Sequence, residues 1–395
     1  LDGTGYNRFY SGYTNTGSGQ VSFTFSAPTT IVTTQPTTGI VGGILNDPQA
    51  FAVRLTKDGT NPPDSPVEVT ATFEASSPSG ATFAVGTDKA MTVGGVATFS
   101  NLSIIGPDGN YTLTFTAPGY PSATSGVVAL TPGEPSALSL IDVASPSLQV
   151  ADPGNRTTVT VTTKDVGNNT TTLPAGITLA ATAGDIIDPV VNNNDGTYTA
   201  DYRGTSSIAD SPVTISGIID EGTVDEIAIT DTAEVTLTPG AAFALAITTP
   251  PSAGSAYSGE VLGTQPVVEI RDEFSNKTES TATVDVELTS GVGTLTGTKS
   301  VDAVLGVATF SDLVITGTAS EPYVLTFSSG GLTDAVSSSF FLAKEPQTII
   351  FGTAPNPTWS DGGTFTVSAS ATSGLPVSFS SDTTGVCTAD GSTPI

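Results

Sequence analysis

Five carboxylates lie close together in one stretch of the sequence, IIDEGTVDEIAITD: Asp220, Glu221, Asp225, Glu226 and Asp231. Paired carboxylates in a cleft can hydrolyse glycosidic bonds, and several oxygen ligands on one loop can hold Ca²⁺. The stretch lacks the D-x-D-x-D-G pattern of an EF-hand loop. Two interpretations therefore stand. One is a calcium site made by Asp220, Glu221, Asp225 and Glu226, and the other is a solvated hairpin tip.

A basic residue precedes an Asp at three points: Lys57-Asp58, Lys164-Asp165 and Arg271-Asp272. A Lys beside a carboxyl group could form an isopeptide bond, but the Arg at the third point cannot. An Asn follows each Asp by three or four positions: Asn61, Asn168 and Asn276. We predict instead that each Asp makes a turn by accepting hydrogen bonds from its own backbone.

Six Asn residues stand in the triplet Asn-x-Ser/Thr: Asn101, Asn110, Asn155, Asn168, Asn169 and Asn276. The triplet accepts N-linked glycans only in an organism and compartment that has the enzyme. A Thr-rich chain reaches several such triplets by chance. The candidate acceptors are Asn101, Asn110, Asn155, Asn168 and Asn276.

The amino-acid composition excludes most catalytic mechanisms. The 395 residues include no His, one Cys and one Met. Without His, the chain lacks the commonest general base and metal ligand, and it cannot form a Ser-His or Cys-His nucleophile. The scarcity of Cys and Met suits an extracellular setting. We expect no enzyme activity and no cofactor other than the calcium considered above.

The charge excludes two classes of partner. Lys and Arg total 11 against 38 Asp and Glu, which gives a net charge of −27. A nucleic-acid binder needs a basic face, and an anionic membrane surface would repel this chain. No apolar run approaches the roughly 18 residues of a membrane span. We therefore expect no nucleic acid and no membrane insertion.

The chain repeats itself. The same 107-residue interval separates Asp58 from Asp165 and Asp165 from Asp272. It also separates Pro132, Pro239 and Pro346, each in a short linker: TPGEP, TPGAA and AKEP. Repetition at a fixed period indicates a tandem array of domains.

Each repeat reads as short β-strands between turn signals. In the first repeat, three sets of residues alternate along their strands: Phe51, Val53 and Leu55; Val67, Val69, Ala71 and Phe73; Tyr111, Leu113 and Phe115. Alternation with period two is typical of strands with one buried face. About seven strands in about 100 residues is the immunoglobulin-like size. In the middle repeat, we interpret GTYTADY as the counterpart of GVATF, and SPVTISGIID as the counterpart of NYTLTF.

One phrase breaks the alternation. GVATFSNLSIIG, 95–106, recurs as GVATFSDLVITG, 306–317. Phe99 and Leu102 are three positions apart, as are Phe310 and Leu313, so a regular strand cannot bury both members of a pair. We predict one strand with a bulge or bend at Ser100-Asn101 and at Ser311-Asp312.

On these residues the repeats resemble bacterial immunoglobulin-like modules of the invasin/intimin-like kind, found in the stalks of large surface proteins. The resemblance rests on three features: the strand Gly-Val-Ala-Thr-Phe-Ser-x-Leu-x-Ile, the x-Tyr-x-Leu-x-Phe strand after it, and the Asp…Asn turn. The middle repeat is closer to filamin- or invasin-type modules. The resemblance implies an extracellular, non-enzymatic stalk.

The two ends resemble parts of such domains. Residues 1–29 look like a closing hairpin, and 346–395 look like an N-terminal half that begins QTIIF and continues SGLPVSFSS. One interpretation is a window from a longer array. The other is exchange, in which 1–29 of a neighbouring copy complete 346–395.

We therefore predict an all-β chain of tandem immunoglobulin-like β-sandwich domains in an elongated array. The expected domains are 1–29, 30–133, 134–240, 241–345 and 346–395. The expected function is a stalk or fibre of a surface adhesin or filament, whose partners are copies of the chain or further repeats. The alternatives are a module that binds a carbohydrate or host protein, and the spacer of a cell-wall enzyme.

Overall fold

A computed structural model describes residues 26–150, 156–358 and 362–389. These residues form β-strands and loops with one 3-10 helix, η1 (Ile208–Asp210). Within this part of the chain, no helix is long and apolar enough to cross a membrane. The described residues form two compact units. One holds 26–148, 156–205 and 210–237, and the other holds 149–150, 206–209, 238–358 and 362–389.

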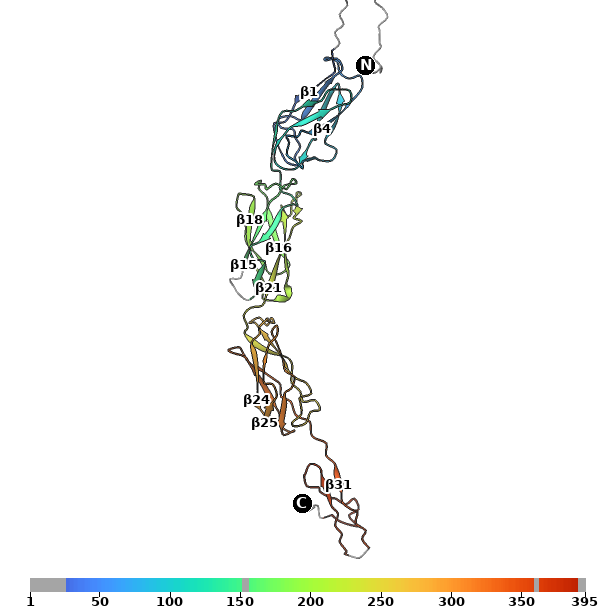
Figure 1. Ribbon diagram of the computed structural model, residues 1–395, viewed down its shortest axis with the longest axis vertical. Helices are drawn as coiled ribbons and strands as arrows, with labels where there is room; N and C mark the ends of the chain where they lie inside the picture. Colours follow the sequence, from blue (N-terminus) through green and yellow to red (C-terminus); the bar gives the residue numbers. More distant parts are fainter. Residues whose placement is uncertain (1–25, 151–155, 359–361, 390–395) are drawn as a thin grey trace, which may run out of the picture. The chain divides into compact units, whose positions relative to one another are not determined.

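The first sandwich comprises the strands between residues 29 and 131, drawn in blue to teal in Figure 1. Its long sheet has the order β1 (Thr29–Thr34), β3 (Phe51–Thr56), β7 (Val96–Phe99), β6 (Lys89–Val93), β4 (Glu68–Phe73), β10 (Leu113–Thr116), β11 (Ala123–Thr124). Its second sheet has the order β2 (Thr38–Ile40), β12 (Val128–Thr131), β9 (Gly109–Tyr111). A further pair is β5 (Thr82–Phe83) with β8 (Ile104–Ile105).

The second sandwich comprises the strands between 140 and 238 and has two sheets. The first sheet has the order β13 (Leu140–Val143), β15 (Arg156–Thr162), β18 (Thr197–Arg203), β17 (Asp185–Asn192). The second has the order β14 (Ser147–Gln149), β21 (Ala233–Thr238), β19 (Val213–Ile219), β16 (Ile177–Ala181), and β20 (Ile227–Ala228) pairs with β19.

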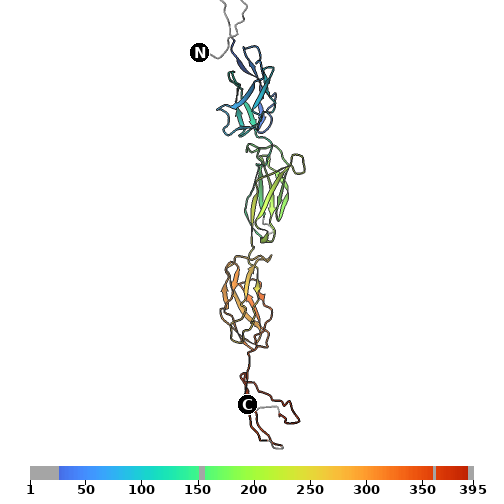
Figure 2. The same cartoon turned by 90° about the vertical axis from the view of Figure 1, so that its right-hand side faces the viewer.

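The third sandwich comprises the strands between 244 and 336, drawn in orange in Figure 2. One sheet has the order β22 (Ala244–Thr249), β23 (Val267–Arg271), β27 (Val307–Thr309). Another has the order β26 (Ser300–Asp302), β24 (Thr283–Ser290), β29 (Val324–Ser328), β30 (Ala335–Val336). A pair is formed by β25 (Gly293–Thr296) and β28 (Val314–Gly317).

The last described segment holds β31 (Ile349–Phe351) and β32 (Ala369–Ala371), which pair antiparallel. The first two long strands of each sandwich pair in the same way: β1 with β3, β13 with β15, and β22 with β23. The segment thus shares this antiparallel pairing, and its assignment to the first half of a further domain stays a prediction. The hairpin predicted for 1–29 falls mostly outside the described residues. The domain boundaries stay predictions.

The predicted alternation is confirmed in the first sandwich. Phe51, Val53 and Leu55 are all buried on β3, and Tyr111, Leu113 and Phe115 are buried around β10. Their core also includes Val69 and Ala71 of β4, with Val67 and Phe73 packed against it. Because strand side chains alternate between faces, one apolar set per strand is enough to build each core.

Strand pairing confirms both assignments in the middle repeat. β7 pairs with β3, and β27 pairs with β23, so the GVATF strands lie beside the second long strand. β18, which carries GTYTADY, lies beside β15 in the same place. β19 pairs with β16, just as β10 pairs with β4.

The repeated phrase is not one strand, and that prediction is wrong in part. The bend is present, but each phrase forms two strands in different sheets: β7 and β8 in one copy, β27 and β28 in the other. Phe99 and Leu102 are both buried, as are Phe310 and Leu313. Because the chain crosses between sheets at the bend, both apolar residues reach the core. In the second copy Asp312 holds the corner, accepting hydrogen bonds from the N–H and hydroxyl of Thr298 at 2.8 and 2.9 Å.

Candidate functional site: two buried aspartate–asparagine clusters

Two buried aspartates among the described residues follow the second long strand of a sandwich. Asp165 comes three residues after β15, and Asp272 comes directly after β23. Asp165 is fully buried, and Asp272 is 2% exposed. A buried carboxylate is costly unless hydrogen bonds satisfy it. The surroundings of these two side chains therefore decide what the sites can do.

The first cluster consists of Asp165, Asn169 and the linker residue Gly133. Oδ1 of Asp165 accepts hydrogen bonds from the N–H groups of Gly167 and Asn169, at 2.8 and 2.9 Å. The side-chain amide of Asn169 lies 3.0 Å from Oδ1 and 2.9 Å from Oδ2. The predicted Asp turn is thus confirmed, with an added bond from the Asn side chain.

The same carboxylate also fixes the linker before the second sandwich. Oδ2 of Asp165 accepts the N–H of Gly133 at 2.8 Å. A Cβ on Gly133 would lie 2.0 Å from the carbonyl oxygen of Val41, in the first sandwich. Real Cβ atoms do not approach so closely, so the position requires glycine.

Asn169 reaches back to the first sandwich as well. Its amide donates to the carbonyl oxygen of Gly106 at 3.0 Å, and its Oδ1 accepts the N–H of Asp108 at 3.1 Å. The backbone of Gly167 packs closely against this loop: a Cβ on Gly167 would be only 2.1 Å from the carbonyl oxygen of Gly106. The cluster therefore joins a turn, a linker and the end loop of the preceding sandwich through one amide and one carboxylate.

The second cluster, Asp272, Asn276 and Gly240, repeats this arrangement. Oδ1 of Asp272 accepts from the N–H groups of Phe274 and Asn276, and Oδ2 accepts from Gly240, at 2.8 to 2.9 Å. The Asn276 amide donates to both carboxylate oxygens, at 3.2 and 2.9 Å. It also donates to the carbonyl oxygen of Ser206 at 2.8 Å, and its Oδ1 accepts the N–H of Ile208 at 3.1 Å. Ser206–Ala209 belongs to the same compact unit.

Neither carboxylate is neutralised by a cation, since the ion pairs among the described residues involve other acids. Burial by itself would raise the pKa of Asp272. Hydrogen bonds from the Asn276 side chain and from the N–H groups of Gly240, Asn276 and Phe274 outweigh burial, and the pKa falls below the ordinary 3.8. Donors to the ionised form stabilise it, so Asp272 stays charged.

The asparagine of the first cluster is Asn169, where the sequence pattern had pointed to Asn168. Asn168 is exposed and has a φ of 66°, and Ser275 in the next repeat has a φ of 69°. Both residues occupy the left-handed corner of the turn, which Asn tolerates. Asn169 and Asn276 are separated by the 107-residue period, so the period itself could have identified the right residue.

Four of the five acids of the acidic stretch lie in the loop between β19 and β20, whereas Asp231 follows β20 and accepts the N–H of Ile141 at 2.8 Å. Glu221, Asp225 and Glu226 are exposed, and Glu226 accepts the N–H of Gly222 at 2.8 Å. Asp220 is half-buried and accepts the N–H of Gly176 at 2.6 Å. Nowhere in the described part of the chain do three acidic, His or Cys side chains come together as metal ligands. The calcium site stays a prediction.

The candidate glycan acceptors lie in different settings. Asn101, Asn110 and Asn168 are exposed, whereas Asn155 lies outside the described residues. The Asn276 amide already donates to Asp272 and Ser206. Glycosylation there would break the second cluster, because a glycan is attached through the same nitrogen. Glycan attachment at the exposed positions stays a prediction.

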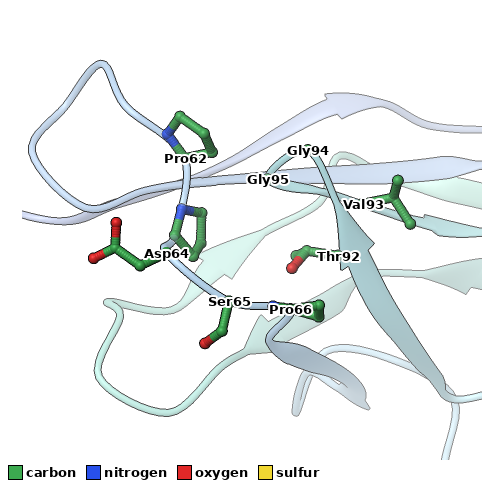
Figure 3. Close-up of a pocket in the computed structure, with 9 residues that line it drawn as sticks. Pro62, Asp64, Ser65, Pro66, Thr92, Val93, Gly94 and Gly95 are labelled. Carbon is green, nitrogen blue, oxygen red and sulfur yellow. The ribbon is translucent and has the colours of Figure 1, made fainter.

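A hollow of about 260 Å³ lies in the first sandwich, between the Pro62–Pro66 loop and the turn at Thr92–Gly95 (Figure 3). Ligand sites for small molecules usually measure ~300–1,000 Å³ and gather several polar groups. Here the one charged lining residue is Asp64, which pairs with Lys57. The hollow does not have the make-up of a catalytic or cofactor site.

No family model matches the chain, and no curated protein matches it either. Solved structures similar to it include invasin, a bacterial integrin-binding protein, at 16% identity and a TM-score of 0.37 over 82% of this chain. The chain spans 61% of the length of that structure. Protocadherin gamma B2 domains 3–6 are 14% identical over 87% of this chain and 83% of theirs, with a TM-score of 0.35.

The D00–D0 domain of intimin is 11% identical over 53% of this chain and 99% of that structure, with a TM-score of 0.28. Invasin and intimin, the proteins whose modules the sequence resembles, are therefore among the solved structures to which the chain is similar. At these identities the likeness concerns the fold alone and says nothing about ligands.

Proposed function

We propose that this chain is a non-enzymatic spacer: tandem immunoglobulin-like sandwiches with buried aspartate–asparagine clusters that hold the linker glycines Gly133 and Gly240. It would serve as part of an extracellular stalk or fibre on a cell surface, next to further repeats or copies of the chain. The absence of His, the single Cys and the net charge of −27 fit an exposed, self-repelling role outside the cell.

The observation that carries the proposal is the recurrence of the cluster. Asp165 and Asp272 each accept the N–H of a linker glycine, Gly133 or Gly240, at 2.8 Å. A buried carboxylate has no use in an ordinary surface loop. In a spacer, it holds the linker glycine in one position. Buried hydrogen bonds to a charged acceptor are worth about 1.5–3 kcal/mol each, which is enough to restrain a short linker.

The test measures motion at the first cluster in the full chain. Cys387, the free and exposed thiol, is changed to Ser, and spin labels are placed at Val85→Cys and Val224→Cys. Both valines are almost fully exposed, at 103% and 99%, and they lie in the first and second sandwiches. Pulsed electron resonance then reports the distribution of distances between the labels.

We expect a narrow distribution with the intact cluster and a clearly broader one after Asn169→Ala. The matched control is Asn168→Gly, which alters the neighbouring exposed residue while allowing its positive φ. Equal widths in all three proteins would show that the cluster does not restrain the linker, and the proposal would fail.

A further inference from the structure

We infer that the turn at Asp58–Asn61, in the first sandwich, is a third site of this kind and receives the end loop of another immunoglobulin-like sandwich. The inference rests on the proposed function and names the partner surface that it requires. The turn follows β3, as the first cluster follows β15 and the second follows β23.

The internal bonds of this turn match those of the two clusters. Oδ1 of Asp58 accepts the N–H groups of Thr60 and Asn61, at 3.0 and 2.6 Å. The side-chain amide of Asn61 donates to Oδ2 of Asp58 at 2.6 Å. The turn is one residue shorter than the others, with Asn at the third position after Asp where they have it at the fourth.

This turn differs from the two clusters in the remaining hydrogen bonds of its Asn side chain. In both clusters it bridges a carbonyl oxygen and the N–H two residues further along the chain: Gly106 and Asp108 in one, Ser206 and Ile208 in the other. For Asn61, the second amide hydrogen and Oδ1 have no partner among the described residues. A side-chain amide has two N–H donors and an oxygen acceptor. Asn61 can therefore still donate to a carbonyl oxygen and accept from an N–H, as Asn169 and Asn276 do.

Fewer described atoms lie close to this turn than to the first cluster. A Cβ on Gly167 would lie 2.1 Å from the docked Gly106 oxygen, whereas among the described residues a Cβ on Gly59 would meet only Ser26, at 3.6 Å. The hollow lined by Pro62 and Val93 begins at the next residue after Asn61 (Figure 3). Val93 is 82% exposed. A docked loop would thus find exposed apolar surface at Val93, in a hollow whose lining begins at the residue after Asn61.

The partner is defined by backbone geometry. The loops Gly106–Asp108 and Ser206–Ile208 share no side-chain type, yet both present a carbonyl and an N–H two residues apart. The carboxylate of Asp58 already accepts bonds from its own turn, so no cationic partner is required. The occupant is therefore the end loop of a sandwich joined on the N-terminal side, at the spacing of the 107-residue period.

The experiment extends the full chain by one period. A copy of residues 133–239 is inserted between residues 25 and 26, which places its Ser206 69 residues before Asn61, close to the 70 residues that separate Ser206 from Asn276. Asn61 is still present only once, so hydrogen exchange of its side-chain amide can be followed by NMR with selective Asn labelling, and Asn61→Ala assigns the signal. The unextended chain is the reference, and Asn101→Ala, an exposed Asn of the same sandwich, is the control.

We expect exchange at Asn61 to slow by about tenfold in the extended chain, as one added hydrogen bond would give. A second extension inserts residues 26–132 at the same point and tests the Gly106–Asp108 loop; the inserted copy carries Asn61→Ala, so that Asn61 is again present only once. Exchange as fast as in the unextended chain in both extensions would overturn the inference, as would full protection of Asn61 before any extension. If Asn169 restrains its junction and Asn61 stays unprotected, the proposed function survives and only this inference fails.

Discussion

Asn169 holds the carboxylate of Asp165 with a single amide nitrogen, which lies 3.0 Å from Oδ1 and 2.9 Å from Oδ2. The other end of the same amide accepts the N–H of Asp108, 61 residues earlier in the sequence. An ordinary Asp turn needs only its own backbone. The extra bonds indicate that this pair is built to connect parts of the chain.

Asp165→Asn should destabilise the second sandwich by about 3 kcal/mol, because each buried donor left without an acceptor costs roughly 1–3 kcal/mol. Guanidinium unfolding followed by hydrogen exchange in 156–203 measures the loss. Asp225→Asn, at an exposed position, should change stability by less than about 0.5 kcal/mol. Equal effects of the two substitutions would contradict the role given to Asp165.

At neutral pH, Asn276→Asp should destabilise the third sandwich more than Asn276→Ala does, because it places a second carboxylate next to that of Asp272. Like charges at this distance cannot both ionise without cost, so one of the two groups binds a proton as the pH falls. Part of the lost stability should therefore return near pH 4, as seen by thermal unfolding. Asn168→Asp, which adds a charge at an exposed site, should show no such recovery.

The pH dependence of the third sandwich should follow Asp272. Its pKa in the folded state lies below the ordinary 3.8. A lowered folded pKa means that the stabilisation is complete above the ordinary value and is lost as the pH falls through the folded value. Melting temperatures recorded from about pH 6 down to about pH 2 should show this loss, and Asp272→Asn should flatten it. An unchanged slope in the variant would assign the acid sensitivity to other groups.

Phe310→Ala should cost about 3–5 kcal/mol, since it empties a core position where the chain crosses between sheets. The Phe310 ring is 1% exposed, and its centroid lies 5.5 Å from that of Phe327. Val304→Ala is the comparison, because Val304 is 71% exposed and should tolerate the change. Calorimetry of the full chain measures the stability of the two variants. A small loss of stability in Phe310→Ala would mean that the bend between β27 and β28 is not part of the core.

The first junction should not depend on calcium. The oxygens of Asp165 accept five hydrogen bonds, which occupy the lone pairs a cation would use. The distance distribution between labels at residues 85 and 224 should therefore be the same with millimolar Ca²⁺ and with a chelator. Broadening on chelation would place a cation at the junction, and Glu226→Gln would then test whether the acidic loop supplies its ligands.

Several features followed from the sequence alone. The 107-residue period, the buried faces of β3 and β10, the bend between Phe99 and Leu102, and the Asp turns all depend on residues close together along the chain. Strand alternation and Asp turns are local properties, because the side-chain period and the reach of a carboxylate are fixed within a few residues.

Tertiary structure decided the rest. The sequence did not reveal that GVATF and its continuation enter different sheets, because the same bend fits a bulge within one sheet. The 107-residue period pairs Asn169 with Asn276, but it does not explain why Asn169 is used and Asn168 is not. The choice depends on Gly106, whose carbonyl oxygen lies 63 residues away in sequence and 3.0 Å away in space. Only the folded chain brings that oxygen to the amide, so the connection between the two sandwiches is a property of the fold.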